Sequence, residues 1–365
     1  MSLLEIENLS TEFETDEGVV KAVDDVDLTV REGETVGIVG ESGSGKSVTA
    51  LSIMGLIDSP GRITDGRIEF NGEDLSEVSD ERRRELRGDE MSMIFQDPME
   101  GLNPVLRIGD QISETLRAHD QIPGEEIDWL EQSLLGNFVP RRSVEERFPR
   151  SWERSVELMA EVGIPEPEQR AKEYPHQFSG GMLQRAMIAQ ALAGEPDLLI
   201  ADEPTTALDV TIQAQILNLL NDLQEDHGTS ILLITHDLGV VVEVCDRVAV
   251  MYAGEIVETA PVEELFTDPK HPYTQGLLKS IPSTKERTRL QPLAGQVPDL
   301  IDMPDACYFA PRCDHAHEEC YDGVPRMYET GPNHGTRCVL YDEADPNAAP
   351  EPGEVGEPSR GESDD

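Results

Sequence analysis

Residues 40–47 have the types and spacing of a loop that wraps a phosphate group. The stretch fits the pattern G-x-x-x-x-G-K-[ST] at every position, and its members are Gly40, Glu41, Ser42, Gly43, Ser44, Gly45, Lys46 and Ser47. Glycines allow successive backbone N–H groups to point at phosphate oxygens, and the following helix adds the positive end of its dipole. Lys46 can then reach the β- and γ-phosphates, while the Ser47 hydroxyl can bind Mg²⁺. The loop predicts binding of ATP with Mg²⁺; a glycine-rich turn without a ligand is the simpler alternative.

Two adjacent carboxylates, Asp202 and Glu203, follow a short apolar run at residues 197–201. An aspartate at the end of a buried strand suits Mg²⁺, directly or through water. The neighbouring Glu203 is placed to polarise an attacking water as a general base. Solvated carboxylates at a strand end are common in an acidic chain. We favour the functional interpretation because α/β sheets bind ligands at this edge.

Strand and helix patterns alternate around these residues. Apolar, β-branched runs predict strands at 19–30, 35–39, 197–201 and 230–235. Helical spacing predicts three helices: one that begins near residue 46, one at 181–193 and one at 211–226. This order favours an α/β fold with a mostly parallel sheet. Residues 97–177 are charged and helical, which indicates an inserted helical subdomain, and beyond residue 260 we expect irregular, Pro-rich structure.

The stretch FSGGMLQR, which begins at Phe178, resembles the signature motif of the ABC ATPases. It places Ser179, Gly180 and Gly181 at the start of a helix, which is a second natural anion site. A serine cap with flexible glycines would explain these residues alone. Other landmarks of the family follow in its order, and they resemble its Q-loop glutamine, D-loop, switch histidine and adenine-stacking aromatic: Gln96, Ala207-Leu208-Asp209, His236 and Phe13.

The resemblance covers residues 3–340 and implies a P-loop NTPase core of the RecA-like kind. This ATP-binding core is expected at residues 1–96 and 186–260, with the helical subdomain and signature at 97–185. A family-specific extension that carries a cysteine cluster is expected at 261–341. Residues 342–365 have the composition of a disordered acidic tail.

The resemblance also implies a mechanism in which two ATPase subunits close head to tail. Each ATP then lies between the Lys46 loop of one subunit and the Ser179 motif of the other, with contacts from Phe13 and Asp209. Hydrolysis is assigned to Glu203, His236 and Gln96. The Mg²⁺ ligands implied by the family are Ser47, Gln96 and Asp202.

Several segments are similar to the ATPases of oligopeptide, dipeptide and nickel importers, above all His271–Leu277 and Gly295–Leu300. We therefore expect a second ATPase subunit (a copy or a paralogue), two transmembrane permeases and an extracellular solute-binding protein as partners. The solute stays open between dipeptides, longer peptides, nickel and sugars. Soluble ABC ATPases, exporter ATPases and P-loop kinases lack this combination of segments. One departure from the family is a longer segment at 122–150.

Four cysteines, Cys307, Cys313, Cys320 and Cys338, form a C-x5-C-x6-C-x17-C cluster. Reduced thiolates suit an iron–sulfur cluster or zinc, and relatives with this tail point to [4Fe-4S] first, zinc second and plain thiols third. Nearby histidines keep a mixed Cys/His zinc site open: His315, His317 and His334. We expect Cys245 in the core.

The chain is strongly acidic, with a formal net charge of -45 over 365 residues. Salt screens such self-repulsion, so the composition predicts a high-salt cytoplasm. The same charge argues against nucleic acid as a partner. The sequence shows neither a signal-peptide pattern nor an apolar run long enough to span a membrane. We therefore expect a peripheral protein on the cytoplasmic face of the cell membrane.

Overall fold

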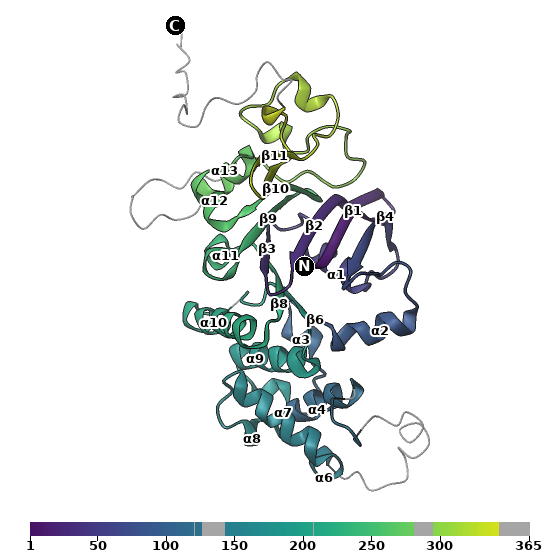
Figure 1. The fold of residues 1–365 in the computed structure, drawn as a ribbon, viewed down its shortest axis with the longest axis vertical. Helices are drawn as coiled ribbons and strands as arrows, with labels where there is room; N and C mark the ends of the chain where they lie inside the picture. The colour runs from purple at the N-terminus through teal and green to yellow at the C-terminus, as the bar shows by residue number, and fades with distance from the viewer. Residues whose placement is uncertain (120, 126–142, 207, 281–294, 343–365) are drawn as a thin grey trace.

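The computed structural model of the chain describes residues 1–119, 121–125, 143–206, 208–280 and 295–342. Figure 1 shows an elongated molecule with β-sheets in the middle, a group of helices at one end and the C-terminal segment at the other. Most of the 122–150 segment and nearly all of the acidic tail lie outside the described residues. Within the described part, no helix is both long and apolar enough to cross a membrane.

The main sheet has eight strands in the described residues, in the order β11-β12-β10-β9-β3-β8-β7-β6. Its parallel part consists of β9 (Arg247–Tyr252), β3 (Thr35–Val39), β8 (Ser230–Thr235), β7 (Leu198–Asp202) and β6 (Met91–Ile94). The antiparallel part consists of β10 (Glu255–Pro261), β12 (His334–Thr336) and β11 (Tyr328–Gly331). Strands β3, β7 and β8 are buried along their whole length, as apolar parallel strands covered on both faces should be. Their carboxyl ends share one edge, so the loops that follow them meet there.

A second, antiparallel sheet packs beside the first. Its strands are β2 (Gly18–Arg31), β1 (Ser2–Thr15), β4 (Gly61–Phe70) and β5 (Glu73–Asp74), in that order. Helix α1 (Lys46–Met54) contacts β1, β2 and β7. Leu4, Phe70, Ile38 and Ile53 belong to one buried cluster that joins the two sheets and this helix. The helix after the phosphate loop is thereby fixed between both sheets.

The helices fall into two groups. Helices α2 (Asp80–Asp89), α10 (Val210–His227) and α11 (Leu238–Val244) accompany the sheets. The helical subdomain contains α3 (Pro98–Gly101), α4 (Ile108–Ala118), α6 (Val144–Arg147), α7 (Pro149–Glu161), α8 (Pro167–Arg170), α9 (Gly180–Ala191) and the short turns η1 (Pro175–Gln177) and η2 (Leu192–Gly194). A buried cluster including Ile112, Trp152, Met187 and Leu199 ties this subdomain to the main sheet. The helices expected at 181–193 and 211–226 are present as α9, extended by η2, and α10.

The C-terminal segment is more regular than its sequence indicates. It contains α12 (Val262–Thr267), α13 (Pro272–Lys279), the turns η3 (Ala310–Arg312), η4 (Glu318–Tyr321) and η5 (Val339–Tyr341), and strands β11 and β12. The expectation of irregular structure beyond residue 260 was therefore wrong for these parts. The two strands are short and mostly polar, so periodicity did not reveal them. Strand β12 exists because it pairs with β10, which places the extension on the edge of the main sheet.

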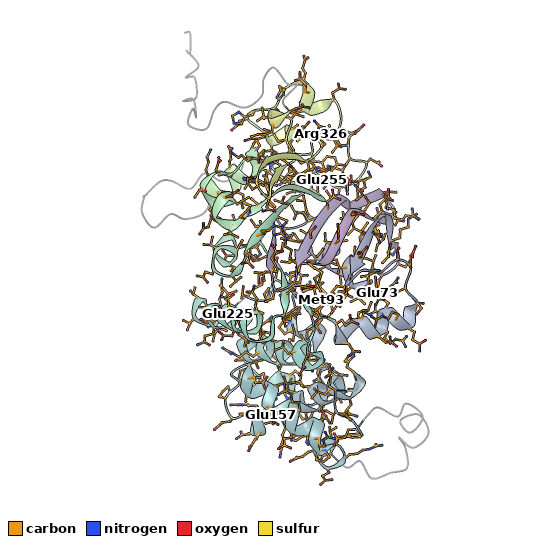
Figure 2. All side chains as sticks on the ribbon, in the orientation of Figure 1. Glu73, Met93, Glu157, Glu225, Glu255 and Arg326 are labelled. Atoms are coloured by element: carbon orange, nitrogen blue, oxygen red, sulfur yellow. The ribbon has the colours of Figure 1, made fainter. Side chains whose placement is uncertain are left out.

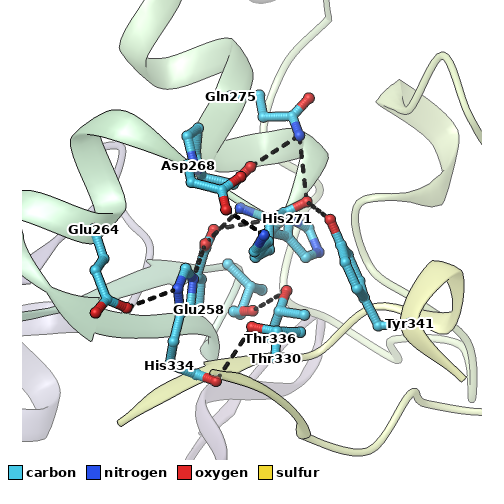
Figure 3. Close-up of polar contacts among 12 residues, drawn as sticks. Glu258, Glu264, Asp268, His271, Gln275, Thr330, His334, Thr336 and Tyr341 are labelled. Atoms are coloured by element: carbon cyan, nitrogen blue, oxygen red, sulfur yellow. Dashed lines mark hydrogen bonds and ion pairs between the residues drawn. The ribbon is translucent and has the colours of Figure 1, made fainter. Parts of the chain in front are cut away.

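A buried carboxylate fastens this junction. Glu258 on β10 is fully buried and accepts hydrogen bonds from the backbone N–H groups of Lys270 at 2.6 Å and His271 at 2.9 Å. His334 of β12 places Nε2 2.8 Å from the same carboxylate and Nδ1 3.5 Å from Glu264 (Figure 3). Both nitrogens of His334 are thus engaged at the junction, so this histidine does not serve the cysteine cluster as the sequence suggested.

Candidate active site

The predicted phosphate loop joins β3 to α1, and close packing requires two of its glycines. A Cβ atom at Gly40 would lie 2.1 Å from the Met251 carbonyl oxygen, and one at Gly45 would lie 2.2 Å from that of Ala22. Gly45 also has a φ of 102°, which L side chains rarely adopt. The exposed Gly43 has a φ of 79° and no neighbour within 4 Å of the added atom. The loop is therefore pressed against the fold on one side and open on the other.

Lys46 is buried and turns back on the loop. Its ammonium donates to the carbonyl oxygens of Gly40 and Glu41, each at 2.9 Å. Burial lowers the pKa of Lys46, although the negative charges of Glu203, Asp202 and Glu41 oppose the shift. The Lys46 ammonium, which the sequence predicts to contact the phosphates, thus lies at the centre of the loop with carboxylates around it.

Asp202 ends β7 at 4% exposure, and burial raises its pKa while a hydrogen bond from Ser47 and the charge of Lys46 lower it. Its Oδ1 is buried without a hydrogen-bond partner. A buried carboxylate oxygen left free beside a serine hydroxyl is the donor set that Mg²⁺ prefers. The residues present therefore fit the predicted Mg²⁺ site at Ser47 and Asp202.

Glu203 brings the predicted catalytic residues together. Its carboxylate accepts a hydrogen bond from Gln96 Nε2 at 3.1 Å and lies 3.2 Å from Nδ1 of His236. Thr206, which the sequence analysis missed, donates to it at 2.7 Å. Burial alone would raise the pKa of Glu203, but the hydrogen bonds from Thr206 and His236 and the charges of His236 and Lys46 lower it overall. The carboxylate is thus held ionised, as a general base must be.

The signature motif lies on a different layer of the molecule. Ser179 caps α9 and accepts from the N–H of Met182 at 3.4 Å, and both Ser179 and Gly180 are exposed. A Cβ at Gly181 would meet Ile212 of α10 at 2.7 Å. Helix α9 packs on α3, α4, α7 and β6, whereas α1 packs on β1, β2 and β7. Within the described residues, no hydrogen bond joins 179–181 to 40–47, and the helices that follow the two motifs pack mainly on different elements.

Two further predicted nucleotide contacts have local partners. Asp209 caps α10 and accepts from the N–H groups of Thr211 at 3.1 Å and Ile212 at 3.0 Å. Phe13 lies on β1, opposite Gly61 of β4, where a Cβ at Gly61 would come within 2.5 Å of its ring. Both residues have structural roles visible in this chain, and their nucleotide contacts stay predictions.

Comparison with known proteins identifies the family of this chain. Residues 23–206 match the ABC transporter family, and residues 257–320 match the oligopeptide/dipeptide transporter C-terminal region. The chain is an ABC transporter ATPase. It is 49% identical to the oligopeptide transport ATP-binding protein AppD of Bacillus subtilis, over 94% of this chain and 98% of that protein. It is 46% identical to the dipeptide transport ATP-binding protein DppD of Escherichia coli, over 93% and 96% of the two chains.

Solved ABC cassettes share the fold. The dimeric cassette MJ0796, bound to ADP and Pi in a post-hydrolysis state, matches with a TM-score of 0.57 and 27% identity over 71% of this chain and 98% of its own. CbiO1 from Clostridium perfringens matches with a TM-score of 0.55 and 25% identity over 73% and 91%. The predicted P-loop NTPase fold, the family and the ATPase activity are confirmed.

The four cysteines of this ABC ATPase line one small cavity. His271 and His315 line it as well, while His317 lies 3.5 Å from Cys320. Burial raises the pKa of Cys307 to about 11 and that of Cys338 to about 12. Among the described residues, no three His, Cys, Asp or Glu side chains are arranged to hold a metal ion. The fold gathers the four thiols around one cavity, and burial favours the protonated form of Cys307 and Cys338.

Cys245, the fifth cysteine, is a core residue as expected. It ends α11 and packs against two buried clusters, and its sulfur would lie 2.9 Å from a Cβ at Gly37. Burial raises the pKa of its thiol strongly.

A groove of about 260 Å³ lies between the sheets and the helical subdomain of this ATPase. Figure 2 labels Met93 at this junction. The apolar lining residues come from both parts and include Met54, Met91, Met93, Phe95 and Met187. Phe95 directly precedes Gln96, so the groove adjoins one of the predicted catalytic residues.

Proposed function

We propose that this ATPase energises the import of peptides and that each ATP is held between two ATPase subunits. The observation that carries the proposal is that the Ser179 motif and the Lys46 loop precede helices that pack mainly on different elements, while Ser179, Gly180 and Gly43 are all exposed. A second subunit is needed to complete the site.

The roles proposed for the residues follow from their contacts. The loop amides and Lys46 bind the phosphates, and Ser47, Asp202 and Gln96 hold Mg²⁺, which neutralises phosphate charge when bound. Glu203 accepts the proton of the attacking water, while His236 and Gln96 keep its carboxylate in place. Ser179, Gly180 and Gly181 of the opposing subunit face the γ-phosphate.

The substitution Glu203→Gln tests this assignment because it keeps the shape and removes the base. Hydrolysis should fall by about a hundredfold or more, while Mg-ATP binding persists and light scattering reports an ATP-dependent dimer. The matched control is Glu195→Gln, on the exposed turn after η2, which should leave turnover and pairing unchanged. Near-normal hydrolysis by Glu203→Gln would refute the role of this residue. A purely monomeric form, alone and with a paralogous subunit, would refute the shared site.

We propose that two permease subunits dock in the groove between the sheets and the helical subdomain, on the cytoplasmic face of the membrane. The groove is apolar, methionine-rich and large, as a surface that accepts a helix of another protein should be. An extracellular binding protein would deliver the solute. Met93→Asp should abolish copurification with the permeases while ATP binding is retained; unchanged copurification would exclude this surface.

Peptides are the proposed solute because relatives named for oligopeptide and dipeptide transport align over nearly the whole chain. The alternative is nickel or another small solute carried by the same machinery. Uptake of a labelled dipeptide by vesicles that contain the complete transporter separates these possibilities. ATP-dependent uptake of nickel, without peptide uptake, would favour the alternative.

We propose that the cysteine cavity holds a structural centre, [4Fe-4S] before zinc. Four thiols on one cavity are the donor set of such a centre, and binding would require them to lose their protons. Protein purified without oxygen should absorb near 400 nm. Stoichiometric zinc without this band would assign zinc, and metal-free protein of unchanged stability would leave plain thiols.

The high-salt host is likewise a proposal, supported by the charge of -45. Salt should raise the melting temperature continuously from low to multimolar KCl because screening removes self-repulsion. A melting temperature that does not rise would contradict it.

We further propose the division into a core (1–96 and 186–260), a helical subdomain (97–185) and an extension (261–341), although α9 and the pairing of β10 with β12 cross these boundaries.

A further inference from the structure

The C-terminal extension reaches the nucleotide loop at a single residue, Glu41. The Glu41 carboxylate accepts hydrogen bonds from Arg312 at 2.8 Å and 3.3 Å, in a two-pronged contact. The backbone N–H of Glu41 donates to the hydroxyl of Tyr273 at 3.0 Å. The carbonyl of Glu41 accepts from Lys46 at 2.9 Å. Side chain, N–H and carbonyl of one loop residue are thus all held, two of them by the extension.

Arg312 is built into its position. Its side chain is only 6% exposed, and its guanidinium also donates to the Tyr252 hydroxyl at 3.3 Å. It lies over the rings of Tyr252 and Phe309. Tyr252, Tyr273 and Phe309 contact one another with ring centroids 4.6 to 5.5 Å apart. This aromatic cluster therefore holds the buried guanidinium of Arg312 next to the loop.

The charge of Glu41 makes this contact consequential. A carboxylate on the second residue of a phosphate-binding loop stands next to the place where a triphosphate must lie, and two like charges repel at short range. The fold keeps this carboxylate half-buried at 28% exposure, where water screens it incompletely. The guanidinium of Arg312 offsets the negative charge before the nucleotide arrives.

We propose that Arg312 is a positioning residue for ATP binding: it neutralises and holds the Glu41 carboxylate so that the loop accepts the triphosphate, and Tyr273 fixes the same peptide from its N–H. The C-terminal extension thereby forms part of the nucleotide site. This inference rests on the proposed role of residues 40–47 as the nucleotide loop.

The test compares steady-state ATP hydrolysis and fluorescent-nucleotide binding in a set of variants. Arg312→Gln should raise the KM for ATP about tenfold, as expected when one partner of a charge-assisted hydrogen bond is lost, with kcat within twofold. Glu41→Gln should change the KM less than threefold because it removes the repelling charge together with the pair. The double variant should return the KM to within threefold of the unaltered protein. Arg312→Lys should give an intermediate KM, and Tyr273→Phe should raise it a few-fold.

Arg326→Gln is the matched control. Arg326 belongs to the same extension but is exposed, stacks on Tyr328 and lies near the end of the molecule that the C-terminal segment forms (Figure 2). Its KM should not change. A purely structural role for Arg312 predicts that the double variant is no better than Arg312→Gln, and that result would overturn the inference, as would an unchanged KM in Arg312→Gln. Lys46→Ala distinguishes failure of the loop assignment from failure of the role of Arg312. If this variant binds ATP normally, the assignment of residues 40–47 as the nucleotide loop is wrong.

Discussion

The nucleotide loop and the cysteine region are both built from residues with evident chemistry, yet the fold treats them differently. Around the loop, Lys46, Asp202, Glu203 and their partners already stand in hydrogen-bonded contact. Around the cavity, four thiols are gathered, burial raises the pKa of Cys307, Cys313 and Cys338, and the described part of the chain has no metal-holding arrangement. The loop works mainly through backbone groups, which the local fold fixes. The cysteine side chains come from separate turns of the extension, so only tertiary packing can place them together.

The junction between the main sheet and the C-terminal extension depends on side chains brought together by tertiary packing, as the cysteine region does. Glu258, His334 and Arg312 are single side chains whose partners lie far away in the sequence. Substitutions should therefore act differently in the two places: an added Cβ should damage the loop, whereas loss of one polar side chain should damage the extension.

The largest effect is expected from Gly45→Ala. Its Cβ would lie 2.2 Å from a backbone carbonyl at a φ of 102°, so the loop must shift and ATP affinity should fall by a hundredfold or more, corresponding to about 3 kcal/mol. Gly43→Ala is the control: its Cβ meets no atom within 4 Å, and only the cost of positive φ, about 1 kcal/mol, remains. Calorimetric titration with a slowly hydrolysed ATP analogue measures both. Equal losses would show that packing against the fold does not shape the loop.

A second effect is expected at the junction. Glu258→Ala leaves the N–H groups of Lys270 and His271 and the ring of His334 without their buried partner, which should cost about 3 kcal/mol of unfolding free energy. Glu264→Ala removes the other contact of His334, but this carboxylate is 47% exposed and should matter by less than about 1 kcal/mol. Urea denaturation compares them. Similar losses would contradict a buried anchor at Glu258.

A smaller, pH-dependent effect is expected from Glu255, which lies between the regions. Burial raises its pKa to about 8, although Arg337 nearby lowers it, and the adjacent Gly254 donates to Ser44 of the loop. The folded state then holds a proton that the unfolded state releases near the ordinary glutamate pKa of 4.5. Unfolding free energy should therefore decline between pH 4.5 and 8, because the unfolded state releases this proton and the folded state keeps it.

Glu255→Gln carries no titrating proton, so its stability should decline less over the same pH range. Lys21, Asp24 and Asp25 also face this carboxyl and remain in the variant, so the difference between the two pH profiles isolates Glu255. Parallel profiles in thermal melts from pH 5 to 8.5 would show that the carboxyl is ionised in the folded protein.

The sequence alone determined the loop, the paired carboxylates and the alternating fold. Each depends on a few consecutive residues: the glycines of 40–47 and the apolar strands that end at Val39 and Asp202. Local backbone rules are enough to predict them because the chemistry sits where the strands end. The family landmarks at Gln96 and His236 were likewise in place, and both lie beside Glu203.

Only the tertiary structure decided how the extension is used. Arg312 and Glu41 are separated by 271 positions, and no periodicity links them. Strand β12 has three residues and forms by pairing with β10 and β11, so a pattern of apolar alternation could not reveal it. The same pairing turned His334 toward Glu258 and away from the cysteines. Long-range contacts of single side chains depend on the whole fold, which is why the cysteine spacing predicted a shared cavity but not what it holds.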